Sequence, residues 1–141
     1  MIPYEQYKRL IEVLPILCVD VVITNSSGKY LLLKRANQPR KGQWWVIGGR
    51  VLKEETLEQA VARKVWQESA LKIQILYPIG YYEEFSLDNP FGLSTPYHAV
   101  SIVFEAVVED GVDIKLDEQS VAWKFSEELP AEFRVRKFYI S

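Results

Sequence analysis

The chain has 141 residues, enough for one domain with a sizeable core, and 48% of them are hydrophobic, which excludes a disordered polypeptide. The net charge of -2 indicates neither a nucleic-acid nor a membrane partner, and a single cysteine, Cys18, excludes an internal disulfide framework. No stretch is long and apolar enough to span a bilayer, and no signal peptide opens the sequence. We therefore expect a cytoplasmic protein with a single domain, residues 1–141.

The first half of the chain predicts a helix, a hairpin and a second helix. Residues 4–14 have the apolar spacing of a short amphipathic helix. Two apolar runs, 16–24 and 30–34, predict strands, and the sequence Asn-Ser-Ser-Gly at 25–28 between them is typical of a hairpin turn. A second helix is predicted at about residues 57–69.

The second half predicts further strands and a final helix. Residues 72–85 predict one or two strands interrupted near Pro78, and 87–96, with Asp, Asn, Gly and two Pro, predict a loop. Residues 98–108 predict a strand, 118–125 a short final strand, and 127–139 a C-terminal helix. Helices and strands intermixed in this way favour an α/β sandwich around a mixed β-sheet.

The segment from Gly48 to Leu71 has the strongest chemical signal. It combines a Gly-Gly turn with a helix that ends near Glu68. A glycine lets a backbone carbonyl approach a ligand closely, and a carbonyl beside a carboxylate suits a hard cation such as Mg2+. Positions 64, 67 and 68 share one face of the helix, and among them only Glu68 is a strong metal ligand.

Two pairs of charges in this segment have alternative interpretations. Lys64 lies one turn from Glu68, so the two form either a solvated surface pair or part of a ligand site. In the second case Lys64 pairs with Glu68 or supplies the charge of a second cation. Glu55 and Arg63 are expected to pair and fix the loop that precedes the helix, and the alternative is two unrelated surface charges.

The order of these residues resembles the Nudix box, G-x5-E-x7-R-E-U-x-E-E-x-G-U, in which U is aliphatic. The positions that fit are Gly49, Glu55, Arg63, Val65, Glu68 and Leu71, and those that depart from it are Lys64, Gln67 and Ala70. The resemblance implies a Nudix hydrolase, with the Nudix-type α/β/α sandwich around a mixed β-sheet.

A wider resemblance is to GDP-mannose mannosyl hydrolases, a Nudix branch that cleaves the sugar C–O bond of GDP-sugars. It is carried by KRANQPRKGQWWVIGGRV at residues 34–51, by KEETLEQA at 53–60, and by Gly80, Phe85, Asp88, Asn89, Gly92, His98 and Asp-Glu-Gln at 117–119. It extends from about Pro15 to Leu129.

This resemblance implies a nucleoside diphosphate sugar as substrate and a homodimer. It implies one Mg2+, with Mn2+ as the alternative cation, on the Gly49 carbonyl, Glu68 and Gln119. The residues that it implies for the nucleotide, the sugar or the departing diphosphate are Asp20, Arg35, Arg50, His98 and Trp123. Arginine forks match phosphate oxygens, and fixed cations stabilise the charge that develops on a leaving diphosphate.

Ser120 is the main departure from that branch, which has a histidine there as its general base. A serine hydroxyl does not take a proton from water unaided at neutral pH. A general base that does so contributes about 10²–10⁴-fold in rate. Ser120 thus marks the expected catalytic position without its base. Three explanations stay open: His98 or Glu118 acts instead, the enzyme cleaves a pyrophosphate at phosphorus, or the protein binds a nucleotide sugar with little or no turnover.

Overall fold

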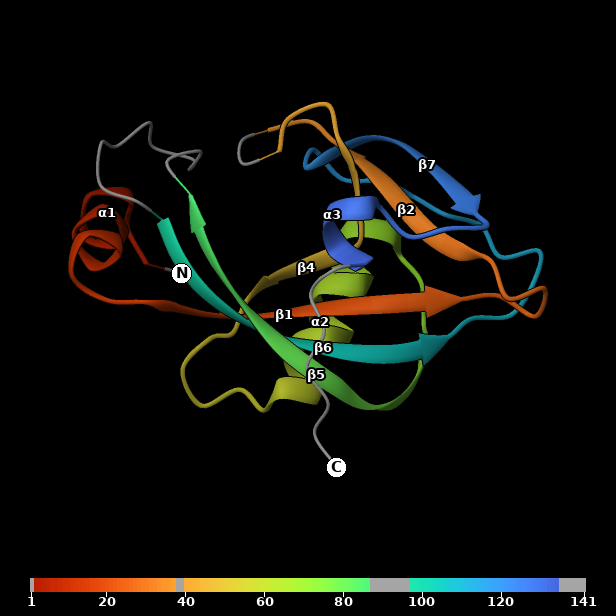
Figure 1. Cartoon of the computed structure of the whole chain (residues 1–141), viewed down its shortest axis with the longest axis horizontal. Helices are drawn as coiled ribbons and strands as arrows, with labels where there is room; N and C mark the ends of the chain where they lie inside the picture. Colours follow the sequence, from red (N-terminus) through yellow and green to blue (C-terminus); the bar gives the residue numbers. More distant parts are fainter. Residues whose placement is uncertain (1, 38–39, 87–96, 135–141) are drawn as a thin grey trace.

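The computed structural model describes residues 2–37, 40–86 and 97–134, which form a mixed β-sheet with helices on both faces (Figure 1). The helices are α1 (Tyr4–Val13), α2 (Leu57–Ser69) and α3 (Ala131–Arg134). The strands are β1 (Ile16–Thr24), β2 (Tyr30–Arg35), β3 (Trp44–Trp45), β4 (Ile47–Arg50), β5 (Gln74–Ser86), β6 (Tyr97–Val107) and β7 (Ser120–Ser126). None of the helices in these ranges is long and apolar enough to cross a membrane.

Strand β1 lies in the middle of the sheet, whose main order is β3-β2-β1-β6-β5. One edge of β1 pairs in parallel with β6 along its whole length. The other edge pairs with β4 from Cys18 to Val21, and with β2 at Thr24. Strand β2 continues away from β1 and pairs with β3 and β7. The sheet therefore divides beside β1, and the candidate site lies near this division.

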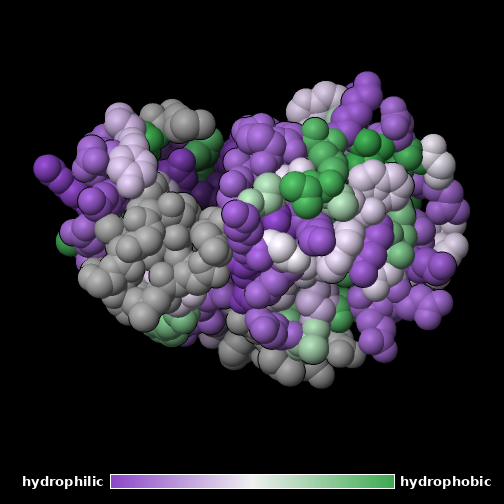
Figure 2. All heavy atoms as spheres, turned by 90° about the horizontal axis from the view of Figure 1, so that it is seen from above, coloured by the Kyte–Doolittle hydropathy of each residue, from purple (hydrophilic) through white to green (hydrophobic). Residues whose placement is uncertain are grey.

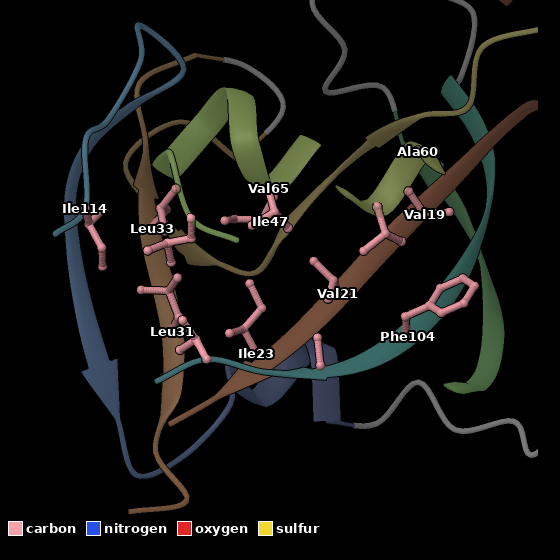
Figure 3. Close-up of a cluster of buried hydrophobic side chains, with 14 residues drawn as sticks. Val19, Val21, Ile23, Leu31, Leu33, Ile47, Ala60, Val65, Phe104 and Ile114 are labelled. Atoms are coloured by element: carbon pink, nitrogen blue, oxygen red, sulfur yellow. The ribbon is translucent and has the colours of Figure 1, made fainter. Parts of the chain in front are cut away.

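The alternation of side chains along β1 explains why helices cover both faces of the sheet. Val19, Val21 and Ile23 belong to a cluster with α2, which contributes Ala60, Val61 and Val65 (Figure 3). Val22 points to the opposite face, into a second cluster that contains Phe133 of α3. Successive residues of a strand face opposite sides, so one strand supplies both cores. The α/β/α sandwich predicted from the sequence is confirmed.

Helix α2 has strong signals at both ends. Thr56 is its N-cap: the Thr56 Oγ1 accepts a hydrogen bond from the Gln59 backbone N–H at 3.1 Å, and the Gln59 side chain accepts one from the Thr56 N–H at 2.9 Å. This capping box satisfies two N–H groups that the helix leaves open. Ala70 ends the helix in the left-handed conformation, with φ of 59°. Glycine adopts that conformation most readily, so Ala70 replaces the box glycine at some energetic cost.

Most predicted elements agree with the structure within two residues. The turn at 25–28 is confirmed, because Asn25 Oδ1 accepts hydrogen bonds from the backbone N–H groups of Ser27 and Lys29 at 3.1 and 3.0 Å. Residues 74–86 form one strand, β5, and its register shifts on both sides of Pro78 explain the interruption expected there. The loop predicted at 87–96 lies outside the described residues.

Two features of the sequence were interpreted incorrectly. Strands β3 and β4 were not predicted, because they are short and the second contains two glycines. The turn expected at Gly48 and Gly49 is wrong: both residues belong to β4 and pair with β1. The helix predicted from residue 127 begins only at Ala131. Pro130 explains the delay, since a proline disfavours helical backbone in the residue before it. Residues 135–139 of that prediction lie outside the described part of the chain.

Candidate active site

A pocket of about 400 Å³ gathers most of the residues that the sequence singled out. Its lining includes Asp20, Arg35, Gly49, Arg50, Glu68 and Gln119. They come from β1, β2, β4, α2 and the residue before β7, so segments far apart in the chain meet here. Seen from above, the molecule is hollowed, with hydrophilic residues along the hollow (Figure 2). A larger cavity of about 720 Å³, near Ala70 and Val107, contains none of these side chains.

The loop before α2 is fixed by the ion pair that the sequence predicted. The Arg63 Nε donates to Glu55 Oε2 at 2.7 Å, and its Nη2 donates to Glu55 Oε1 at 3.0 Å. The same Nη2 also donates to the backbone carbonyl of Arg50 at 2.8 Å. The Arg63 guanidinium lowers the pKa of the Glu55 carboxyl, with a further contribution from the Leu52 N–H. This network fixes the end of β4 at Arg50, which lines the pocket.

Lys64 and Glu68 form a largely buried ion pair inside the site. The Lys64 Nζ lies 3.0 Å from Glu68 Oε2, and the two side chains are 18% and 4% exposed. The alternative of a solvated surface pair is therefore wrong. A Cβ at Gly49 would lie only 2.5 Å from Lys64 Cε, so the lysine stem passes directly over this glycine. Burial raises the pKa of Glu68, and the Lys64 charge opposes that shift.

Asp20 is a second buried acid of the pocket, at 6% exposure. Its Oδ2 accepts hydrogen bonds from the Tyr82 hydroxyl and, at 2.9 Å, from the Ser101 hydroxyl. A Cβ at Gly48 would collide with Asp20 Oδ1, so only glycine fits opposite this carboxyl. Burial raises the pKa of Asp20 to about 6, although both hydrogen bonds oppose the shift. Asp20 is thus held by hydroxyl groups in a site that disfavours its charge.

This raised pKa predicts a pH-dependent gain in stability for Asp20→Asn. Between pH 3.8 and about 6 the native chain binds more protons at Asp20 than the unfolded chain, so stability falls as pH rises through that range. Asparagine avoids this loss, which is roughly 3 kcal/mol at most. Urea unfolding should show the variant more stable than the parent at about pH 7.5, with the difference gone below about pH 4. An equal difference at both pH values, or a gain for exposed Asp113→Asn, would contradict this explanation.

Several lining residues carry no signal in the sequence. Tyr7 of α1 lies below Arg50, with the guanidinium 4.5 Å from the ring centre. Arg40 stacks at 3.9 Å over Trp45 and forms ion pairs with Glu84 and Glu132. Tyr97, another lining residue, contacts Cys18. Burial raises the pKa of the Cys18 thiol to about 12. These residues are brought together by the tertiary fold, so spacing along the chain does not reveal them.

Three predicted site residues do not line this pocket. His98 is on the other face of β6 from Tyr97, Ala99 and Ser101; its ring stacks on Phe85 at 4.3 Å, and its Nε2 lies 3.4 Å from a Glu83 oxygen. Ser120 is only 7% exposed and lies opposite Arg35 in the β2–β7 pairing. Trp123 is 43% exposed on β7, edge-on to Phe125.

The three residues predicted to hold Mg2+ line the pocket together. The residues that the structure describes contain no group of three or more His, Cys, Asp or Glu able to hold a metal ion. Glu68, Gln119 and the Gly49 carbonyl supply one charged and two neutral oxygens. Mg2+ commonly binds through one or two carboxylates together with substrate phosphates. The set is therefore adequate for a single ion that also takes oxygens from the ligand.

The chain is similar to known proteins along most of its length. The NUDIX domain family matches residues 14–139. The low-salt glycan biosynthesis protein Agl8 of Haloferax volcanii is 30% identical over 118 residues, which cover 84% of this chain and 74% of that protein. An ADP-ribose pyrophosphatase of Methanocaldococcus jannaschii is 38% identical over 90 residues. These residues are 64% of this chain and only 49% of that relative.

A solved structure of a similar protein has the same fold. The MutT protein from Methanosarcina mazei Go1 superimposes with a TM-score of 0.69 at 28% identity, covering 86% of this chain and 89% of that one.

Proposed function

The chain belongs to the Nudix hydrolase family, and on this basis we propose that it hydrolyses a nucleoside diphosphate sugar at the sugar C–O bond. The observation that carries the proposal is the meeting of Arg35 and Arg50 with Glu68 and Gln119 in one pocket. Two guanidinium groups suit a diphosphate, and the oxygen donors suit its cation. The name of the Haloferax relative points to glycan chemistry, in agreement with a sugar nucleotide as substrate.

The proposed reaction is attack of water on the anomeric carbon of the sugar. A new C–O bond forms to water, and the bond from this carbon to the diphosphate oxygen breaks with its electron pair left on the diphosphate. Arg35 and Arg50 stabilise the charge that develops there. A bound Mg2+, held by Glu68, Gln119 and the Gly49 carbonyl, would supply further neutralisation of the diphosphate. The proton lost by water requires a base.

We assign that base to Glu118 rather than His98. Glu118 lines an adjoining pocket of about 590 Å³ that shares Arg50, Lys64 and Gln119 with the site. Its exposed position leaves the carboxylate accessible to water and to a ligand. His98 lines neither pocket.

Glu118→Gln should accordingly lower kcat by about 10²–10⁴-fold, the usual contribution of a general base. His98→Gln, a matched change of a titratable side chain, should leave kcat within about twofold, since the imidazole lies on the other face of β6. Steady-state rates for both variants as a function of pH provide the measurement. A large loss in His98→Gln with normal activity in Glu118→Gln would reverse the assignment.

A second candidate function is pyrophosphate cleavage at phosphorus. It is favoured by the 38% identity to an ADP-ribose pyrophosphatase. Lys64 and Gln67 weigh against it, because they replace two carboxylates of the box and leave Glu68 alone to attract cations. A third candidate, a nucleotide-sugar binding module without turnover, is favoured by the same replacements and by Ser120.

A panel of nucleoside diphosphate compounds with Mg2+, with products resolved by mass, separates these functions. The proposed activity gives a nucleoside diphosphate and a free sugar. Cleavage at phosphorus gives a nucleoside monophosphate and a sugar phosphate. Saturable binding of several compounds with no product from any of them would support the binding module and contradict both hydrolytic functions.

A further inference from the structure

The Lys64 ammonium is located where a ligand of this pocket would meet helix α2. Lys64 lines both the main pocket and the adjoining one, as do Arg50 and Gln119. Its stem crosses Gly49, where the Lys64 Cε lies 2.5 Å from the position that a Cβ would occupy, and its ammonium is 3.0 Å from Glu68. Two neighbours thus fix the position of the charge: the glycine below the stem and the carboxylate beside the ammonium.

Lys64 and Glu68 offset each other's charge without any metal ion. Glu68 is the one carboxylate among the three expected metal donors, and Lys64 offsets its charge. A divalent cation that binds Glu68 must share this carboxylate with the ammonium, because the two are already in hydrogen-bond contact. An ammonium also offers three N–H donors, of which the Glu68 contact uses one. The remaining donors are available at the boundary of the two pockets.

The geometry points to Lys64 as a fixed cation of the active site that binds the ligand's diphosphate and takes the place of a second divalent ion. Glu68 has two functions in this arrangement: it orients Lys64, and it holds the single metal ion. The inference rests on the proposed function for the nature of the ligand, a nucleoside diphosphate. Lysine is a common phosphate ligand and acts as a point charge, so one ammonium can replace a cation without any metal geometry.

Binding of GDP in EDTA tests this inference without any turnover. Calorimetry should detect GDP binding to the parent chain in EDTA, and Lys64→Gln should weaken it at least 10-fold. Lys72→Gln, in an exposed residue that lines neither pocket, is the matched control and should bind like the parent. Thermal unfolding followed by circular dichroism identifies variants that fail to fold. Equal GDP affinity of Lys64→Gln and the parent in EDTA would overturn the inference.

Lys64→Glu provides an independent test with a metal alone as the probe. It restores the carboxylate of the box beside Glu68, so Mn2+ should bind at least 10-fold more tightly, as measured by electron paramagnetic resonance without nucleotide. GDP binding by this variant should then require metal. Unchanged Mn2+ affinity in folded Lys64→Glu would contradict a shared position of ammonium and metal.

The results also separate this inference from the proposed function. If no nucleotide sugar is hydrolysed but Lys64→Gln loses GDP binding in EDTA, the hydrolytic proposal fails and the role of Lys64 stands. If the parent releases free sugar and Lys64→Gln binds GDP in EDTA as tightly as the parent, the hydrolytic proposal stands and the inference fails.

Discussion

Glu68→Gln is expected to lower turnover of a nucleotide sugar by at least about 100-fold, because it removes the one charged donor that we propose for the metal and the partner of Lys64. The substitution keeps the size of the side chain, so the fold should persist. The loss should be accompanied by a higher Mg2+ requirement, visible when the rate is titrated with the metal. Circular dichroism melting verifies that the variant is folded.

Glu58→Gln is the matched control for this prediction. Glu58 lies on the same helix, in its exposed first turn, and lines neither pocket. Glu58→Gln removes the same charge as Glu68→Gln, and this control variant should turn over substrate like the parent. Parental activity of Glu68→Gln at limiting Mg2+ would remove Glu68 from the metal site and leave it only as the partner of Lys64.

Arg35→Ala and Arg50→Ala should each lower kcat/KM by about 10²–10³-fold, the usual effect of removing one preorganised group from developing negative charge. Expressed as a free energy, each loss of kcat/KM should exceed the decrease in the free energy of unfolding. The Arg50 backbone carbonyl, which accepts from Arg63, is retained in the alanine variant, so the loop before α2 keeps this contact. Lysine at either position should restore little activity, since it lacks the planar fork that matches two phosphate oxygens.

Arg9→Ala, in an exposed residue of α1, is the control for a general effect of lost positive charge. Steady-state kinetics for the three alanine variants, with urea unfolding in parallel, complete the comparison. The phosphate assignment would be untenable if Arg35→Ala and Arg50→Ala turned over substrate as fast as Arg9→Ala.

The sequence predicted the parts of the fold that local signals specify. Helix α2 belongs to the Nudix-like segment, and β1 has an apolar run that ends at a hairpin turn, so both were predicted with the correct bounds. Strands β3 and β4 owe their conformation to pairing with β2 and β1, and Gly48 and Gly49 conceal any strand pattern. Such elements depend on tertiary contacts that no local pattern records.

The site was predictable within the continuous box, and also at Asp20, Arg35 and Gln119, which the wider resemblance supplied. Gly49, Arg50 and Glu68 belong to the box and reach the same pocket, and Arg63 and Glu55 pair as expected. The face of a strand on which a residue lies was harder to infer. Both faces of β6 carry apolar residues, so the sequence alone does not show that Ser101 faces the pocket while His98 faces away. Tyr7 and Arg40 reach the site only through the tertiary fold.

Hydrolysis in 18O-labelled water tests the central claim most directly. If water attacks the anomeric carbon, as we propose, the label appears in the released sugar and the nucleoside diphosphate carries none. Label in a phosphate group, together with a nucleoside monophosphate as product, would contradict this account and establish attack at phosphorus.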